Sequence, residues 1–349
     1  MQPAPSASAA PALTENDATF AAGMRLVRKT GTYPKDRVLA VAGYAGATAG
    51  VLIVTIVLTA LLSSVSKLAA SVVFLVGVVG VFLGLSFYVD RKLFAMRCAF
   101  AFLVTEVLVK GTVVPARETT KAAESYLNGQ YGDLSAVVEA HNQVQRIVRQ
   151  FFRTFDKLDQ LLPIDLGPVR NAVAFVIDRV APRIADLALS YCVLRAPNEL
   201  ATASKDAVAL VAQNPKAILG TAIRAHFTER FLGGLVGFVT FLIFGGAAFA
   251  LAMASATSAA SGTGMPTEGA QTVGIFAAIF SGLFVGGPLA ALASWFVRTA
   301  FLEPAALAML LVRFHSTTRG QAVDPSVRAR LENASGNLGN AQKLANMFG

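Results

Sequence analysis

Four stretches of this chain are apolar without interruption and long enough to cross a lipid bilayer. Each has about 20 residues or more, and at about 1.5 Å per residue a helix of that length spans the roughly 30 Å hydrocarbon layer. None of them contains Asp, Glu, Lys or Arg; they are Val41–Leu62, Leu68–Tyr88, Leu232–Met253 and Val273–Val297. The short connection within each pair predicts two transmembrane hairpins.

Basic residues are distributed unevenly around these stretches. Lys and Arg precede the first stretch, lie between the second and the third, and follow the fourth, whereas the connection Ala254–Thr272 contains none. Cytoplasmic loops of membrane proteins carry an excess of Lys and Arg. The pattern therefore predicts an integral protein of the plasma (inner) membrane, with both termini and the central region in the cytoplasm.

The composition agrees with a membrane protein and predicts an all-α fold. Charged residues make up only 15% of the 349 residues, and 54% are hydrophobic, whereas soluble domains have roughly a quarter charged. We predict a polytopic protein with four transmembrane helices in two hairpins and a helical, coiled-coil-like cytoplasmic insert. The predicted segments are a disordered basic tail (1–37), the first hairpin (38–90), the insert (91–230), the second hairpin (231–298) and a C-terminal helix and tail (299–349).

Each predicted span contains one GxxxG pair. Two glycines four residues apart lie on one face of a helix and allow another backbone to approach closely. The predicted helix-packing residues are Gly46 and Gly50, Gly80 and Gly84, Gly233 and Gly237, and Gly282 and Gly286. The spans contain no carboxylate, His, Lys or Arg, and hydroxyls such as those of Thr48, Thr55, Thr59 and Thr240 can bond to carbonyls one turn back, which argues against ion coupling.

The insert contains an apolar seam with spacings of three and four residues. Its members are Leu134, Val137, His141, Val144, Val148, Phe151, Phe155, Leu158 and Leu162. A seam this narrow requires a partner helix, either the amphipathic helix predicted over 169–194, another copy of the chain, or another protein. His141 at a core position is interpreted as a buried, hydrogen-bonded or register-setting histidine, with a pH switch as the alternative.

Three further features stand out beside the spans. Glu106 and Glu303 are carboxylates in apolar surroundings: each is either a contact at the cytoplasmic mouth or a local structural charge, paired with Lys110 for Glu106 and at a helix start for Glu303. Pro288 interrupts the fourth span, which predicts either a simple bend or a kink beside a cavity. The sequence also contains two short apolar runs, 98–109 and 304–312, and does not determine whether they enter the membrane.

Motifs for catalysis, metal binding and nucleotide binding are not found. The three histidines are scattered, and no HExxH, CxxC, GxSxG or P-loop occurs. Cys98 and Cys192 are expected to be free, buried thiols. We therefore expect no catalytic residue, no cofactor, no metal and no nucleic-acid partner; the expected partners are the lipid bilayer and another copy or protein at the insert.

These observations favour a non-enzymatic membrane scaffold or assembly component that acts through its helical insert. The main alternative is a transporter or channel for a neutral or lipid-like solute, built from two pseudo-repeated hairpins with Pro288 beside the path. A weaker third hypothesis is a membrane enzyme whose site joins Glu106, Glu303 and His315. That hypothesis requires the three side chains to converge within hydrogen-bonding range.

Overall fold

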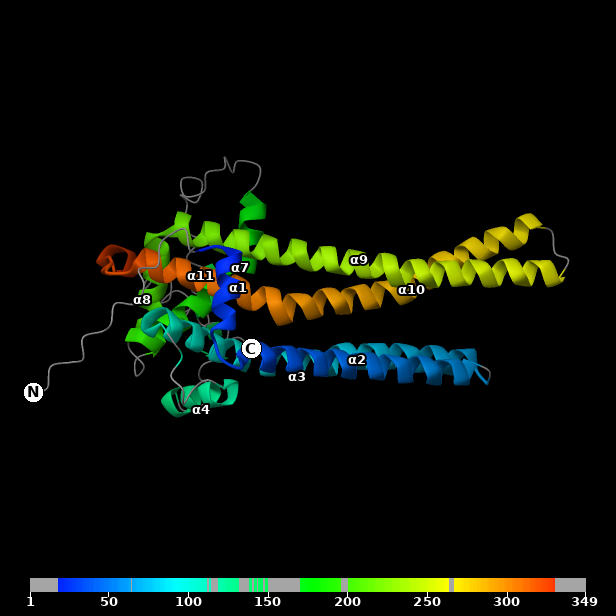
Figure 1. Cartoon of the computed structure of the whole chain (residues 1–349), viewed down its shortest axis with the longest axis horizontal. Helices are drawn as coiled ribbons and strands as arrows, with labels where there is room; N and C mark the ends of the chain where they lie inside the picture. The colour runs from blue at the N-terminus through cyan, green and yellow to red at the C-terminus, as the bar shows by residue number, and fades with distance from the viewer. Residues whose placement is uncertain are drawn as a thin grey trace, which may run out of the picture.

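Two long helix pairs extend from one end of a smaller helical bundle (Figure 1). The computed structural model describes residues 18–63, 65–111, 113, 119–131, 138–139, 141–142, 144–146, 148–149, 170–195, 200–263 and 267–329, and the regular elements within these ranges are helices. The pairs are α2 (Tyr33–Ser63) with α3 (Lys67–Lys110), and α9 (Pro215–Thr263) with α10 (Thr267–Val297). The bundle contains α1 (Phe20–Arg28), α4 (Thr120–Tyr131), α7 (Arg170–Arg195), α8 (Leu200–Gln213) and α11 (Glu303–Thr318).

The helices of the two pairs are longer than a bilayer requires. Helix α3 has 44 residues and α9 has 49, which at about 1.5 Å per residue gives lengths of roughly 66 and 74 Å. The hydrocarbon layer is only about 30 Å thick. Each of these helices therefore continues well beyond its apolar segment, without a break, into the bundle.

Three helical segments are long and apolar enough to cross a membrane, judged by length and composition within the described residues. They are Tyr33–Thr59, Pro215–Ser258 and Gly286–Thr318, and a shorter apolar helix covers Leu68–Gly77. This set differs from the four predicted spans. The apolar window of Gly286–Thr318 is 72% buried inside the protein, because it runs from α10 into a core helix, and apolarity alone does not distinguish lipid from protein surroundings.

The surfaces of the helix pairs are apolar and exposed. Ile53 on α2 and Phe238 on α9 have exposed fractions of 61% and 59%, and other large apolar side chains on α2, α3, α9 and α10 are exposed as well. A water-soluble protein rarely leaves contiguous apolar surface of this extent uncovered. The long apolar helices are thus compatible with an integral membrane protein.

The second hairpin packs through the glycines that the sequence singles out. A Cβ atom added at Gly286 would lie 2.6 Å from the Cα of Gly245, and one at Gly282 would lie 3.1 Å from the Gly245 carbonyl oxygen. At Gly237 and Gly233 the added atom would lie 3.1 Å from Ser294 Cβ and 3.5 Å from Ser294 Oγ, respectively. The backbones of α9 and α10 approach closely at these points, as small residues permit.

The first hairpin uses a different glycine. A Cβ added at Gly46, Gly50 or Gly80 would meet no heavy atom within 4 Å, so these three glycines do not make the close helix contact that GxxxG predicted. The close approach is at Gly77, where the added atom would lie 2.6 Å from Thr55 Oγ1. The spacing of glycines identifies a helix face, but only the packing decides which face meets the neighbour. The surroundings of Gly84 lie outside the described part of the chain.

Hydroxyl groups on the long helices bond to their own backbone, as predicted. Thr48, Thr55 and Thr59 donate to the carbonyls of Tyr44, Val51 and Thr55, each at 2.8 Å, and Thr240 donates to Val236 at 2.8 Å. Such bonds satisfy a polar side chain within its own helix. These threonines consequently require no polar partner on another helix.

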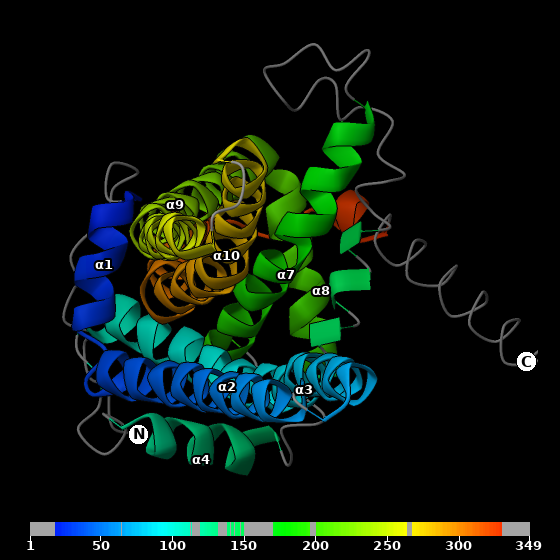
Figure 2. The same ribbon diagram turned by 90° about the vertical axis from the view of Figure 1, so that its right-hand side faces the viewer.

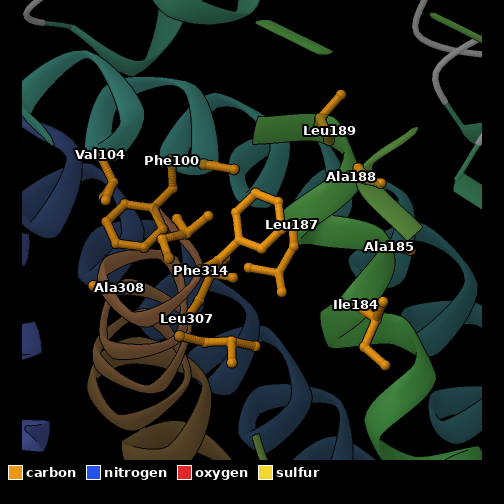
Figure 3. Packing of buried hydrophobic residues seen from close by; sticks show 14 of the residues in the cluster. Phe100, Val104, Ile184, Ala185, Leu187, Ala188, Leu189, Leu307, Ala308 and Phe314 are labelled. Atoms are coloured by element: carbon orange, nitrogen blue, oxygen red, sulfur yellow. The ribbon is translucent and has the colours of Figure 1, made fainter. Parts of the chain in front are cut away.

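Helices from distant parts of the chain meet in one apolar core at the base of the hairpins. Viewed along the long axis, α1 lies on one side of the α9–α10 pair, α7 and α8 lie on its other side, and α4 lies below the α2–α3 pair (Figure 2). Phe100 from α3, Leu187 from α7 and Leu307 from α11 are buried together (Figure 3). The short apolar runs 98–109 and 304–312 belong to this core, since they are the last turns of α3 and the first turns of α11.

The described part of the predicted seam packs within the chain. His141, Val144 and Val148 are buried, and the two valines belong to the core formed with α3 and α7. For these positions the partner helices are the chain's own. The remaining seam residues lie outside the described residues: Leu134, Val137, Phe151, Phe155, Leu158 and Leu162.

Candidate functional site

A cluster of buried and partly buried arginines and glutamates lies where the two hairpins join the bundle. Its first member is Arg37, the last charged residue of α2 and only 1% exposed. Its guanidinium donates to the hydroxyl of Tyr33 at 2.8 Å, to the carbonyl oxygen of Thr299 at 2.8 Å and to the carboxylate of Glu303 at 2.7 Å. Tyr33 is itself fixed by stacking on Phe100, with ring centroids 4.5 Å apart. One arginine therefore links α2 to a segment more than 260 residues later.

A short π-helix explains why the Thr299 carbonyl is available. The segment η4 (Arg298–Leu302) joins α10 to α11, and the N–H of Glu303 donates to the carbonyl of Arg298, five residues earlier. In this pattern Thr299 would accept from residue 304, which is a proline and has no N–H. The Thr299 carbonyl is left without a backbone donor, and a buried carbonyl must find another one. Arg37 supplies it.

Glu303 lies at the centre of the cluster. One carboxylate oxygen accepts from Arg37 on α2, and the other accepts from Arg97 on α3 in a short contact. The backbone carbonyl of Glu303 accepts from Arg183 on α7 at 3.3 Å. Glu303 therefore connects three helices to the start of α11. We name the set Arg37, Arg97, Arg183, Glu229, Arg298 and Glu303 the ionic junction.

Glu229 is the second carboxylate of the ionic junction and anchors α9. Arg183 from α7 donates to it at 2.5 Å, and Arg298 of η4 lies 3.7 Å away. Arg183 thus contacts both glutamates. Burial lowers the pKa of the Arg183 guanidinium, and the Glu229 carboxylate opposes that shift. Charge-assisted contacts of this kind are strong when they are shielded from water.

Chemically, this arrangement fixes helices rather than presenting a reactive group. Both carboxylate oxygens of Glu303 and one of Glu229 are within hydrogen-bonding distance of arginines. Removing one partner of a buried ion pair costs about 3–5 kcal/mol, because the other charge is left uncompensated in the interior. The ionic junction therefore makes the relative position of the hairpins and the bundle sensitive to every one of its members.

His315 takes part in a separate polar chain. Its Nε2 lies 2.8 Å from the hydroxyl of Ser190 on α7, and that hydroxyl lies 2.6 Å from the hydroxyl of Thr105 on α3. Ser190 and Thr105 are fully buried. This series of hydrogen bonds crosses the core and connects α11 to α7 and α3. It gives no indication of a route by which a substrate would reach the Ser190 hydroxyl.

The three residues of the enzyme hypothesis bond to different partners. Glu106 pairs with Lys110 one turn later on α3 at 2.9 Å, as the local interpretation predicted. Glu303 bonds to Arg37 and Arg97, and His315 bonds to Ser190. Each of the three side chains is thus bonded to a different neighbour. Pro288 lies inside α10.

His141 faces a buried carboxylate. Its Nδ1 lies 3.8 Å from Oδ1 of Asp186 on α7, which is too long for a hydrogen bond. The ring of Phe94 on α3 packs against it edge-on, with centroids 4.9 Å apart. Burial lowers the pKa of His141, Asp186 opposes the shift and the nearby Arg97 adds to it. His141 therefore remains neutral near pH 7.

The sequence pointed to Glu303 but not to its partners. Arg37 and Arg97 read as ordinary positive-inside residues, because their position beside a span already explains a basic residue. A usable signal was present at Pro304: a proline directly after a carboxylate predicts a helix start and removes a backbone donor. That signal does not indicate which distant arginine donates a hydrogen bond to the Thr299 carbonyl.

Comparison of the chain with known protein families, curated proteins and solved structures finds no match.

Proposed function

We propose that this chain is a non-enzymatic scaffold of the plasma (inner) membrane, with four transmembrane helices in two hairpins. Both termini and the helical bundle, including the coiled-coil-like segment, face the cytoplasm. The bundle holds the two hairpins in a fixed relation and presents a surface to another copy of the chain or to a protein partner. The proposal combines the charge distribution along the sequence with the packing of the bundle.

The ionic junction is the observation that carries this proposal. It joins α2, α3, α7, α9, η4 and α11 through contacts among buried and partly buried groups. Helices α3 and α9 then continue from it as unbroken rods. A protein built in this way transmits position from the membrane to the cytoplasmic bundle, which suits a structural or assembly role better than chemistry.

The transporter alternative receives less support. It places a path beside the kink at Pro288, near Gly286, yet the backbone of α10 touches Gly245 of α9 at that level. The threonines of the long helices donate their hydroxyl protons to their own backbone, which leaves them no free donor for a solute. A hairpin whose helices pack closely and whose threonines bond to their own backbone favours the scaffold hypothesis over the transporter hypothesis.

The topology is tested by cysteine labelling in sealed cells. Both native thiols are free and buried, so the background is low. We expect Ser258→Cys, near the far end of α9, to react with an impermeant maleimide added outside, and Ser326→Cys to react only after permeabilisation. Both positions are exposed. The reverse pattern, or recovery of the protein from a lysate without detergent, would overturn the proposal.

The scaffold role is tested by the mass of the purified protein in detergent and by cross-linking in intact membranes. We expect a species heavier than the 36.5 kDa monomer. We expect Phe155→Asp, in the C-terminal half of the predicted seam sequence, to reduce its amount while Cys98 stays protected from thiol reagents. A monodisperse monomer without cross-linked partners would contradict the scaffold. Flux of a neutral solute in proteoliposomes that Gly286→Leu abolishes would favour the transporter instead.

A further inference from the structure

The cluster around Glu229 contains more positive than negative charge. Arg183 and Arg298 contact its carboxylate, and Arg179, Arg230 and His226 lie within electrostatic range of it or of one another. The other nearby carboxylate, Asp186, is buried and acts on Arg183 from the bundle side. Among the described residues, the guanidinium groups of Arg183, Arg230 and Arg298 therefore lie near the single carboxylate of Glu229, so the site carries an excess of positive charge.

Two of these arginines, Arg298 and Arg230, are partly or largely exposed. Arg298 Nε is 3.7 Å from Glu229, which is attraction without a hydrogen bond, and the Arg298 side chain is 29% exposed. Arg230 is exposed on α9, directly after Glu229. Guanidinium groups in this state favour a bidentate phosphate or carboxylate ligand.

Large aromatic side chains surround the same point on the outer surface. Phe227 and Phe231 on α9 are 60% and 71% exposed, and Phe301 of η4 is exposed as well. Helix α9 has no charged residue after Arg230, and α10 has none from Gly269 to Val297. Exposed apolar rings next to arginines, at the level where the helices become charge-free, place a surface for acyl chains beside a surface for anionic headgroups.

We propose that Arg230 and Arg298 bind the phosphate of an anionic phospholipid whose acyl chains lie against Phe227 and Phe231. This inference rests on the proposed insertion of α9 and α10 in a bilayer. The excess charge selects a phosphate, and the apolar surface beside it selects a lipid over a free anion. The bound headgroup neutralises the excess charge at the junction and thereby stabilises the contact between the second hairpin and the bundle.

The test compares lipids in bilayer discs that contain the purified full chain. The probes are phosphatidylglycerol and phosphatidylcholine with matched acyl chains, and inorganic phosphate. Binding is measured by native mass spectrometry, and the stability of the junction is measured by protection of Cys98 from a thiol reagent. We expect phosphatidylglycerol to bind and protect, and phosphatidylcholine and inorganic phosphate not to do so.

The decisive variant is the double substitution Arg230→Gln with Arg298→Gln. We expect it to weaken phosphatidylglycerol binding roughly tenfold. The matched control is Arg224→Gln with Arg319→Gln, which removes the same charge from two exposed positions; at 100° per residue, Arg224 lies about 120° around α9 from Arg230. The control is expected to bind like wild type.

The outcomes are separable. Equal phosphatidylglycerol binding by both double variants, or no preference over phosphatidylcholine, would overturn the lipid site. Equal protection by inorganic phosphate would show a free-anion site and would also overturn it. Failure of the wild-type chain to enter the discs at all would instead contradict the proposed membrane insertion. If the decisive variant loses Cys98 protection even in phosphatidylcholine discs, Arg230→Gln alone provides the binding comparison.

Discussion

Replacing Glu303 by glutamine removes the charge that Arg37 and Arg97 share. The substitution keeps the shape and one acceptor oxygen, so the expected loss comes from charge and not from a cavity. The side chains of Arg37 and Glu303 are 2% and 12% exposed, which places the pair among buried ion pairs. Removing one partner of such a pair costs about 3–5 kcal/mol, and the retained acceptor favours the lower end. We expect about 3 kcal/mol, or roughly a 100-fold larger unfolding constant.

The two buried thiols provide the assay. Cys98 directly follows Arg97 on α3, and Cys192 lies on α7. Burial raises the pKa of the Cys192 thiol to about 11, so this group reacts only when the bundle opens. Labelling rates under conditions of rapid reclosing follow the population of the open form. Glu303→Gln should therefore label roughly 100-fold faster than wild type in detergent.

A surface ion pair supplies the control. Glu124→Gln makes the same chemical change at a pair with Lys92, whose side chain is 46% exposed and whose Nζ is 3.4 Å from the Glu124 carboxylate. Exposed pairs contribute about 0–1 kcal/mol, so labelling should change less than roughly fivefold. If Glu303→Gln labels no faster than Glu124→Gln, the view of the ionic junction as a structural lock is wrong.

The remaining predictions concern helix packing, pH and coupling. Gly286→Ala should destabilise the second hairpin by about 1–3 kcal/mol because its Cβ would overlap Gly245, whereas Gly287→Ala, with open space around it, should not; equal thiol labelling of the two variants would contradict the contact. The lowered pKa of His141 means that the unfolded chain binds the proton more readily, so stability should be complete above pH about 6.5 and decline below it; His141→Gln should flatten this dependence of thiol labelling on pH, and an unchanged slope would exclude His141 as its source. Arg37→Met combined with Glu303→Gln should cost at least about 1 kcal/mol less than the sum of the single losses, since it removes the uncompensated cation; strict additivity would argue against a direct pair.

Local features of this protein were readable from the sequence. Glu106 and Lys110 are four residues apart on a helix, so their pairing follows from helix geometry alone. The self-bonded threonines and the all-helical character follow in the same way, because each depends on residues within one or two turns. The glycines of the second hairpin were also identified correctly as small residues on one helix face.

Other features depended on which helices become neighbours. Gly46 and Gly77 are equally small, yet only Gly77 meets the facing helix, since the rotation of each helix is set by everything packed around it. The run 304–312 is as apolar as a membrane segment but forms part of the protein core. An apolar composition shows that a segment avoids water, but it does not show whether lipid or protein surrounds it.

Sequence alone determined that this chain forms long charge-free helices with basic flanks, because length, apolarity and charge are properties of contiguous residues. Only the tertiary structure decided that Arg37 bonds to Glu303, 266 positions later in the sequence. The same holds for the Thr299 carbonyl, which has no backbone donor because residue 304 is a proline and which accepts from Arg37 of α2 instead. Contacts at such separation are selected by the joint packing of many helices. No local pattern in the chain encodes them.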